Sequence, residues 1–322
     1  MNLQSRKNTF TDSLLRLDNI ILWGFALLKQ IIIKQVRSVV GGGKPPTPFL
    51  YPPGDPGLLG PDSVAWRVHA DFMSMMVGGI SSLILQALHP LALAGVWDHS
   101  TFREDLQGRL GRTAFFIAAT TYGNTDMANH AIERVNQIHG ALMGSHPDGR
   151  TYRVNDPHLL YWVHLTEASS FLNAHRLYLD PSISLADQDQ YYLEMSTIAK
   201  KLGCVITNSK GTDAFAKNKI DVEMAIASYF PELEFSDRSQ WVIDLLENYP
   251  STPTTYLLNR AIMKAGFYNL PDWAYPLMGR TAPTALERHL INQSIQLIAK
   301  PVRWALTDGV AAHAKRRMGI FT

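Results

Sequence analysis

The spacing of apolar residues from Ser63 onward is the feature that most constrains the fold. They recur at three- and four-residue intervals, as in helices, and most of these stretches are bounded by residues that start or stop helices. Val154 and residues 205–207 are the only strand-like segments, so no sheet is expected. Helices are predicted over 63–88, 125–142, 157–178, 187–202, 214–216, 221–229, 238–249, 252–265, 284–298 and 301–317. The sequence therefore predicts an all-α, multi-helix bundle.

Three local signals refine this prediction. Thr125 is the predicted N-cap of its helix. Asp156 followed by Pro157 is typical of a helix start. The pair Gly78-Gly79 inside the first long helix predicts close helix packing or a kink.

The N-terminal part of the chain differs from this body. Residues 41–46 and 52–57 are rich in glycine and proline, and neither helix nor strand tolerates that density of breakers. We therefore expect two parts. Residues 1–58 form an N-terminal amphipathic helix with a Gly/Pro-rich arm, and residues 59–322 form a single all-α domain.

The apolar segment 20–40 is too interrupted to cross a bilayer. Its longest uncharged run, Asn19 to Leu28, is about half of the roughly 20 residues required. Lys29, Lys34 and Arg37 lie among aromatic and aliphatic residues, a mixture that suits either packing on the body or peripheral contact with a membrane surface. Packing on the body is the favoured interpretation. No secretory signal is evident, so we expect a cytoplasmic protein, either free or peripheral on the membrane.

Composition excludes several functions. The 30 Lys and Arg residues nearly balance 28 Asp and Glu residues, giving a net charge of +2 at pH 7, so nucleic acid is not an expected partner. Cys204 is the single cysteine, which rules out an internal disulfide and any multi-cysteine metal site. A metal would have to be held by histidine or carboxylate.

His139 is the most informative single residue. It follows Val135 by four positions and precedes Leu142 by three, so its ring is expected on the apolar stripe of its helix. A histidine in this position is either a core residue with a hydrogen-bond partner or a neutral axial ligand of haem iron.

A second candidate is the group Arg109, Arg112 and Thr113. In a helix these residues occupy positions i, i+3 and i+4 and project from one face. Two guanidinium groups and a hydroxyl suit carboxylates, such as haem propionates or an acidic substrate, or bound oxygen. The alternative is a solvated positive face on a surface helix.

Further histidines lie near helix ends. Chain reversal at Pro90 could bring His89 and His99 to one cavity, although each also fits an ordinary turn position. His164 and Glu167 share a helix face, and a hydrogen bond between them is the simpler explanation of that spacing.

Several of these segments, taken in order, resemble one known family. It groups the catalytic domain of rubber oxygenase (latex clearing protein) with the fungal oxygenase of mycophenolic acid biosynthesis. The resemblance covers 59–178 well and the C-terminal half loosely. It is carried by residues 59–71, 85–90, 98–102, 108–113, 122–125, 138–139 and 162–164.

The resemblance implies a globin-like helical fold around haem b and a dioxygen-dependent oxidation or cleavage of a carbon–carbon double bond in an apolar, isoprenoid- or lipid-like molecule. It makes His139 the proximal iron ligand. Arg109 and Thr113 match the family's Arg-x-x-Lys-Thr motif, and Arg112 replaces its lysine. The family's distal glutamate has no evident counterpart.

From residues and resemblance together, the predicted catalytic residues are Arg109, Arg112, Thr113 and His99. The predicted haem-binding residues are His139, which binds the iron, Arg109 and His164. Two alternatives stay open: a non-catalytic haem- or lipid-binding protein of the same fold, or a haem-free enzyme with a histidine general base.

Overall fold

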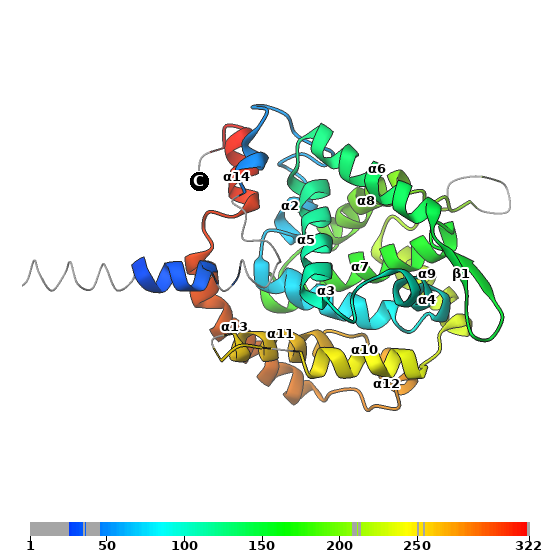
Figure 1. Cartoon of the computed structure of the whole chain (residues 1–322). Coiled ribbons are helices and arrows are strands. Elements are labelled where there is room, and N and C mark those ends of the chain that lie inside the picture. Colours follow the sequence, from blue (N-terminus) through cyan, green and yellow to red (C-terminus); the bar gives the residue numbers. More distant parts are fainter. Residues whose placement is uncertain are drawn as a thin grey trace, which may run out of the picture.

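The structure is a computed structural model, and it describes residues 26–34, 36, 46–207, 211, 214–249, 251–253 and 255–320. It confirms the all-α, multi-helix prediction (Figure 1). The helices are η1 (Thr47–Leu50), α2 (Val64–Val68), α3 (Phe72–Gln86), α4 (Pro90–His99), α5 (Leu106–Tyr122), α6 (Thr125–Ala141), α7 (Pro157–Tyr178), α8 (Leu185–Lys201), α9 (Lys219–Ser228), η2 (Phe230–Glu232), α10 (Asp237–Glu247), α11 (Tyr256–Tyr268), α12 (Ala274–Leu277), α13 (Ala285–Ala305) and α14 (Val310–Arg317). Two short strands, β1 (Met143–Ser145) and β2 (Thr151–Arg153), form an antiparallel hairpin.

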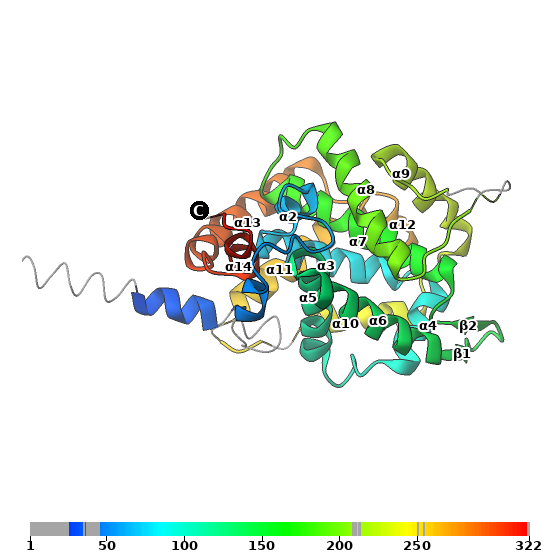
Figure 2. The same ribbon diagram turned by 90° about the horizontal axis from the view of Figure 1, so that it is seen from above.

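Helix α3 lies at the centre of the fold, between α7 and α11 (Figure 2). A Cβ atom on Gly78 would come within 2.7 Å of the Phe171 ring, and a Cβ on Gly266 would overlap the side chain of Ile80. Both glycines therefore bring two helix backbones together. The close packing predicted from Gly78-Gly79 is confirmed at Gly78.

A buried polar network fixes these three helices in register. The amide of Asn269 donates to Ser81 Oγ at 2.9 Å and to the carbonyl of Ser170 at 3.2 Å. Ser81 in turn donates to the carbonyl of Gly266 at 2.8 Å. Because buried polar groups are costly unless they are paired, this network favours one relative position of α3, α7 and α11.

A second buried contact holds α5 in place. His69 Nδ1 lies 2.8 Å from Thr121 Oγ1 on α5, and its Nε2 lies 3.0 Å from the hydroxyl of Tyr191 on α8. Burial lowers the pKa of His69 to about 3, with a smaller contribution from His175, so the ring is neutral.

The Gly/Pro-rich arm is anchored by one arginine. Arg317, which is buried at the end of α14, donates to the carbonyls of Phe49 at 3.0 Å and Asp55 at 2.7 Å. Phe49 is itself buried, in the short helix η1. Residues 46–58 therefore lie against α14, whereas residues 41–45 of the predicted arm are outside the described residues.

Of the predicted segment 20–40, residues 26–34 and 36 are described, and 26–34 are helical. Lys29 Nζ lies 3.3 Å from Thr307 Oγ1 and 6.0 Å from the centre of the Trp304 ring, so this helix contacts the C-terminal part of the chain. Residues 20–25, 35 and 37–40 lie outside the described residues. Among the described helices, none alone is long and apolar enough to span a membrane. Helices α3 and α4 taken together have sufficient length and apolar composition, but their axes are bent by 107° relative to each other.

Several predicted boundaries are wrong. The helix predicted over 63–88 is two helices, because the Asp71 carboxylate accepts the backbone N–H of Ser74 and caps a new helix there. Asn124, not Thr125, caps α6. The expectation of no sheet fails at the β1–β2 hairpin, where Gly149 supplies a positive φ of 94° in the turn.

Two further differences lie in the C-terminal half. A break was predicted before Pro301, but helix α13 continues through it. The helix tolerates this proline because it lies near the helix end, and because the carbonyl left without an N–H partner belongs to the exposed residue Leu297. Helix α11 begins four residues later than predicted, since the side chains of Thr252 and Thr255 hydrogen-bond each other at 3.0 Å. Residues 214–216 are not helical.

Candidate functional site

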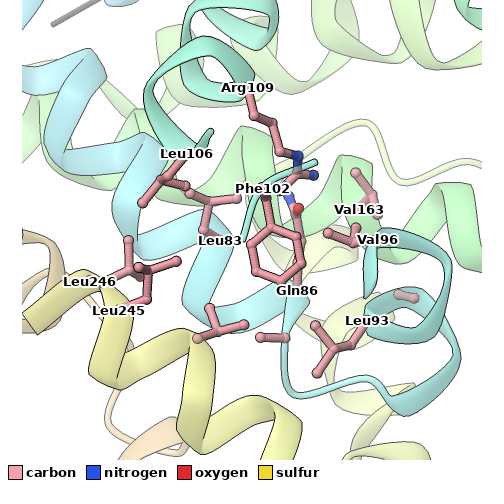
Figure 3. A pocket seen from close by; sticks show the side chains of 13 residues that line it. Leu83, Gln86, Leu93, Val96, Phe102, Leu106, Arg109, Val163, Leu245 and Leu246 are labelled. Carbon is pink, nitrogen blue, oxygen red and sulfur yellow. The ribbon is translucent and has the colours of Figure 1, made fainter. Parts of the chain in front are cut away.

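An apolar pocket lies where α3, α4, α5, α7 and α10 meet (Figure 3). Its cavity volume is about 40 Å³, well below the roughly 300–1,000 Å³ of small-molecule sites, so its walls must move apart to admit a ligand. Among its described lining residues, Arg109 alone is charged and Gln86 is the other strongly polar one. The lining consists of Leu83, Gln86, Ala87, Ala92, Leu93, Val96, Phe102, Arg109, Leu106, Val163, Val242, Leu245 and Leu246.

The corner between α4 and α5 forms one wall of this pocket. Helix α5 starts where Asp105 Oδ1 accepts the backbone N–H of Gly108 at 2.8 Å. Phe102 is buried just before this cap and packs edge-to-face on Trp97 and Trp241, with ring centres 5.9 and 5.5 Å away. Aromatic packing of this kind holds the first turn of α5 against the pocket.

Arg109 extends from that first turn into the pocket (Figure 3). Its guanidinium carbon lies 5.9 Å from the centre of the Phe102 ring. Within the described residues its side chain has no hydrogen bond or ion pair. Burial lowers the pKa of Arg109 to about 10, and Arg112 adds a smaller repulsion. The guanidinium is still charged at neutral pH, so Arg109 is a cation in an apolar pocket without a counter-ion among the described residues.

Arg112 and Thr113 do not share this environment. The Arg112 side chain is 62% exposed, with its Nη1 3.8 Å from Asp105 Oδ2 and its Nη2 3.3 Å from Thr101 Oγ1. Thr113 is also exposed. Of the three residues predicted to share one helix face, only Arg109 lines the pocket shown in Figure 3.

His139 lies in the last turn of α6, half-buried. Its Nδ1 is buried and has no hydrogen-bond partner within the described residues. Burial lowers the pKa of the ring, so the imidazole is neutral near pH 7. His139 is not among the lining residues of the apolar pocket.

The apolar stripe on which His139 was predicted is covered unevenly. Ala128 and Ile132 are buried near the start of α6, but Val135 is half-buried and Ile138 is 47% exposed. In both views α6 runs away from α5 at a wide angle (Figures 1 and 2). The stripe is thus least covered by protein around His139.

On α7, His164 directly follows the lining residue Val163, and Glu167 lies one turn after Val163. Both are half-buried, and burial lowers the pKa of His164 to about 4 and raises that of Glu167 to about 7. The His164 ring packs on Phe215, 5.4 Å away. Among the hydrogen bonds of the described residues, none joins His164 to Glu167.

His89 and His99 are not brought together. They stand at opposite ends of α4, which has 10 residues and therefore separates them by about 15 Å. His99 is exposed, and its Nε2 lies 3.2 Å from the hydroxyl of Tyr152, which donates to Asp98 at 2.6 Å. Neither Asp98 nor His99 lines the apolar pocket.

The structure also places residues at the pocket that the sequence did not indicate. Val242, Leu245 and Leu246 of α10 form the side opposite Arg109, and Leu93 stands in the segment where the family's distal acid was sought. Apolar residues carry no chemical signature, and the contact between α10 and α4–α5 spans more than a hundred residues. No signal in the sequence predicted these positions.

Residues 66–304 match the profile of a protein family described as ER-bound oxygenase mpaB/B'/Rubber oxygenase, catalytic domain. The match covers well over half of the chain and includes the pocket, α6 and α7. No curated protein and no solved structure matches the chain.

Proposed function

Because the chain belongs to the family of mpaB and rubber oxygenase catalytic domains, we propose that it is a haem b-dependent oxygenase that oxidises or cleaves a carbon–carbon double bond of an apolar small molecule. The observation that carries this proposal is Arg109, a cation in an apolar pocket that has no ion-pair partner among the described residues. The apolar lining and its one cation suit the chemistry of a ligand with an apolar body and a carboxylate.

The residues present fit haem on two counts. His139 offers a neutral imidazole with a buried nitrogen that has no partner among the described residues, on a helix whose apolar stripe is only partly covered around it. Neutral imidazole is a standard axial ligand of haem iron. Arg109 supplies the guanidinium that pairs with a propionate carboxylate. We therefore assign iron binding to His139 and propionate binding to Arg109.

Two titratable side chains, His164 and Glu167, lie within one turn of the lining residue Val163 on α7. Each keeps some accessible surface, yet burial is the cause of each pKa shift. In the proposed enzyme His164 contacts the bound cofactor as a neutral ring, and Glu167 holds a proton on its carboxyl group up to about pH 7.

Bound haem would supply the activation of dioxygen, and the protein would supply position and environment. The apolar lining excludes water and holds an alkene by burial of its carbon skeleton. No carboxylate lines the pocket within the described residues, and we assign proton transfer to Glu167, which lies one turn after the lining residue Val163 on α7. Arg112, Thr113 and His99 stay predictions from the resemblance and from spacing.

A membrane-derived substrate would explain the N-terminal helix. Leu27, Leu28 and Ile31 are each nearly half exposed, and Lys29 lies on the same short helix. We propose a cytoplasmic protein that touches a membrane surface through residues 20–40. Deletion of residues 1–43 should then move the protein from the membrane pellet to the supernatant, and an unchanged distribution would contradict the contact.

The absence of a lining carboxylate among the described residues favours one alternative, a carrier of haem or lipid that does no chemistry. Dioxygen uptake separates the two functions. The haem-loaded protein should consume dioxygen when an alkene-containing lipid such as squalene is added, and a saturated analogue should give none. Binding of both lipids without uptake would identify a carrier.

A further inference from the structure

Three side chains from distant segments meet outside the apolar pocket: His89 before α4, His158 in the first turn of α7 and Glu232 at the end of η2. His158 Nε2 lies 2.8 Å from Oε1 and 3.0 Å from Oε2 of Glu232, and His89 Nε2 lies 3.3 Å from the same Oε2. One donor atom from each residue lies within 4.8 Å of the other two. Two imidazoles and a carboxylate are a common donor set for first-row divalent metals.

The state of His89 is an independent indication of a ligand. Its side chain is 2% exposed, and within the described residues its Nε2 has no hydrogen-bond partner despite its approach to Glu232. A buried polar atom left without a partner is costly, so an ion or water that satisfies it is favoured at this position. Nε2 is the atom directed at His158 and Glu232.

The other ring nitrogen of His89, Nδ1, caps helix α4. It accepts the backbone N–H of Ala92 at 3.4 Å, a long hydrogen bond. A metal ion bound at Nε2 would place the ring proton on Nδ1, so this one weak hydrogen bond would be exchanged for a metal–ligand bond.

The three residues are held in place without a metal. The Tyr229 ring stacks on His158 at 4.4 Å, and its hydroxyl donates to the His158 carbonyl at 2.8 Å. Glu234 N donates to the carbonyl of Leu88 at 2.8 Å, which keeps the segment of Glu232 beside His89. A preformed donor set loses little freedom when it binds.

We propose that His89, His158 and Glu232 bind one divalent transition-metal ion, with zinc as the ion used to test it. The side chains of His158 and Glu232 are 50% and 40% exposed, so solvent reaches the site and water completes the coordination. The ion joins the starts of α4 and α7 to η2. Its predicted effect is to stabilise the fold, because it binds the folded chain and not the unfolded one.

The test is zinc binding by the full-length protein after treatment with a chelator, measured by competition with a chromogenic zinc indicator. Wild type should bind one equivalent at this site, and His158→Gln and Glu232→Gln should each weaken binding at least tenfold. His146→Gln is the matched control, since His146 Nδ1 lies 2.9 Å from Asp148 in a two-residue pair elsewhere. It should bind zinc as wild type does.

Equal zinc affinity in wild type, His158→Gln and Glu232→Gln would overturn the proposal. A second measurement guards against a folding defect in one variant. Zinc should raise the midpoint of thermal unfolding in wild type and His146→Gln but not in Glu232→Gln, and an equal rise in all three would also contradict the site. Neither measurement depends on haem or on activity.

Discussion

The guanidinium carbon of Arg109 lies 5.9 Å from the centre of the Phe102 ring, inside a pocket whose other described lining residues are uncharged. The aromatic face offsets part of the desolvation of the cation, since cation–π contacts are worth about 0.5–2 kcal/mol. It does not replace a counter-ion, so the protein without ligand retains an electrostatic cost at this position.

Arg109→Met should therefore have opposite effects on the stability of the haem-free protein and on its affinity for haem. Removal of the unpaired cation should stabilise the haem-free protein by about 1–3 kcal/mol and weaken haem retention at least tenfold. Urea unfolding and haem transfer to apomyoglobin measure the two effects. Arg112→Met, at an exposed position, should change stability by less than about 0.5 kcal/mol. A haem-free Arg109→Met protein less stable than wild type would refute this interpretation.

Glu167 predicts a pH dependence of stability. Burial raises its pKa from 4.5 to about 7, so the folded chain binds more protons than the unfolded chain between those values. The contribution of Glu167 to the free energy of unfolding is therefore fully present below about pH 4.5 and is lost as the pH rises through about 7. In the haem-free protein, Glu167→Gln should thus match wild type at pH 4.5 and be more stable by about 1–3 kcal/mol at pH 8. Equal urea midpoints at pH 8 would contradict the shift.

Asp71 and Arg303 connect the start of α3 to α13. Arg303 Nε lies 2.7 Å from Asp71 Oδ1, its Nη2 lies 2.9 Å from Oδ2, and Asp71 is 7% exposed. Arg303→Met should destabilise the protein by about 3 kcal/mol, because it leaves a buried carboxylate without its cation. In the double variant with Asp71→Asn the loss should be smaller than the sum of the single losses, as urea unfolding would show. Strictly additive losses would mean that the ion pair contributes nothing.

Gly78 tests the contact between α3 and α7. A Cβ there would lie 2.7 Å from the Phe171 ring and 2.9 Å from its Cα, so Gly78→Ala forces the helices apart and should cost about 1–3 kcal/mol. Gly140 in α6 is the control, since a Cβ there meets no atom within 4 Å. Gly140→Ala should stabilise the helix by up to about 1 kcal/mol. Equal thermal midpoints for the two variants would argue against tight packing at Gly78.

The sequence predicted the helical class and most helix positions because periodicity and caps are local properties. Asp156 with Pro157 marks the start of α7 correctly, as its carboxylate accepts the backbone N–H of His158 at 2.8 Å. The break at Asp71 was missed, although aspartate is a good N-cap, because the apolar pattern continues across it. The ion pair with Arg303 that also holds Asp71 lies 232 residues away and has no local signal.

The candidate site was predicted less completely than the fold. Arg109 could be selected from its motif, and the structure places it in the pocket. Helical spacing grouped Arg109 with Arg112, three residues later. The two side chains nevertheless point in different directions: Arg109 enters the pocket, whereas Arg112 approaches Asp105 at the surface. His89, His158 and Glu232 could not be grouped at all, because only the tertiary fold brings them together.

The central claim is that His139 binds the iron of a haem, and the absorption spectrum tests it most directly. Protein purified from cells supplied with haem precursor should show the intense Soret band of bound haem, and His139→Ala should lose it while keeping the far-ultraviolet circular dichroism of a helical protein. His130→Ala, at an exposed position of the same helix, should keep the band. A colourless wild-type protein, or an unchanged Soret band in His139→Ala, would contradict the account.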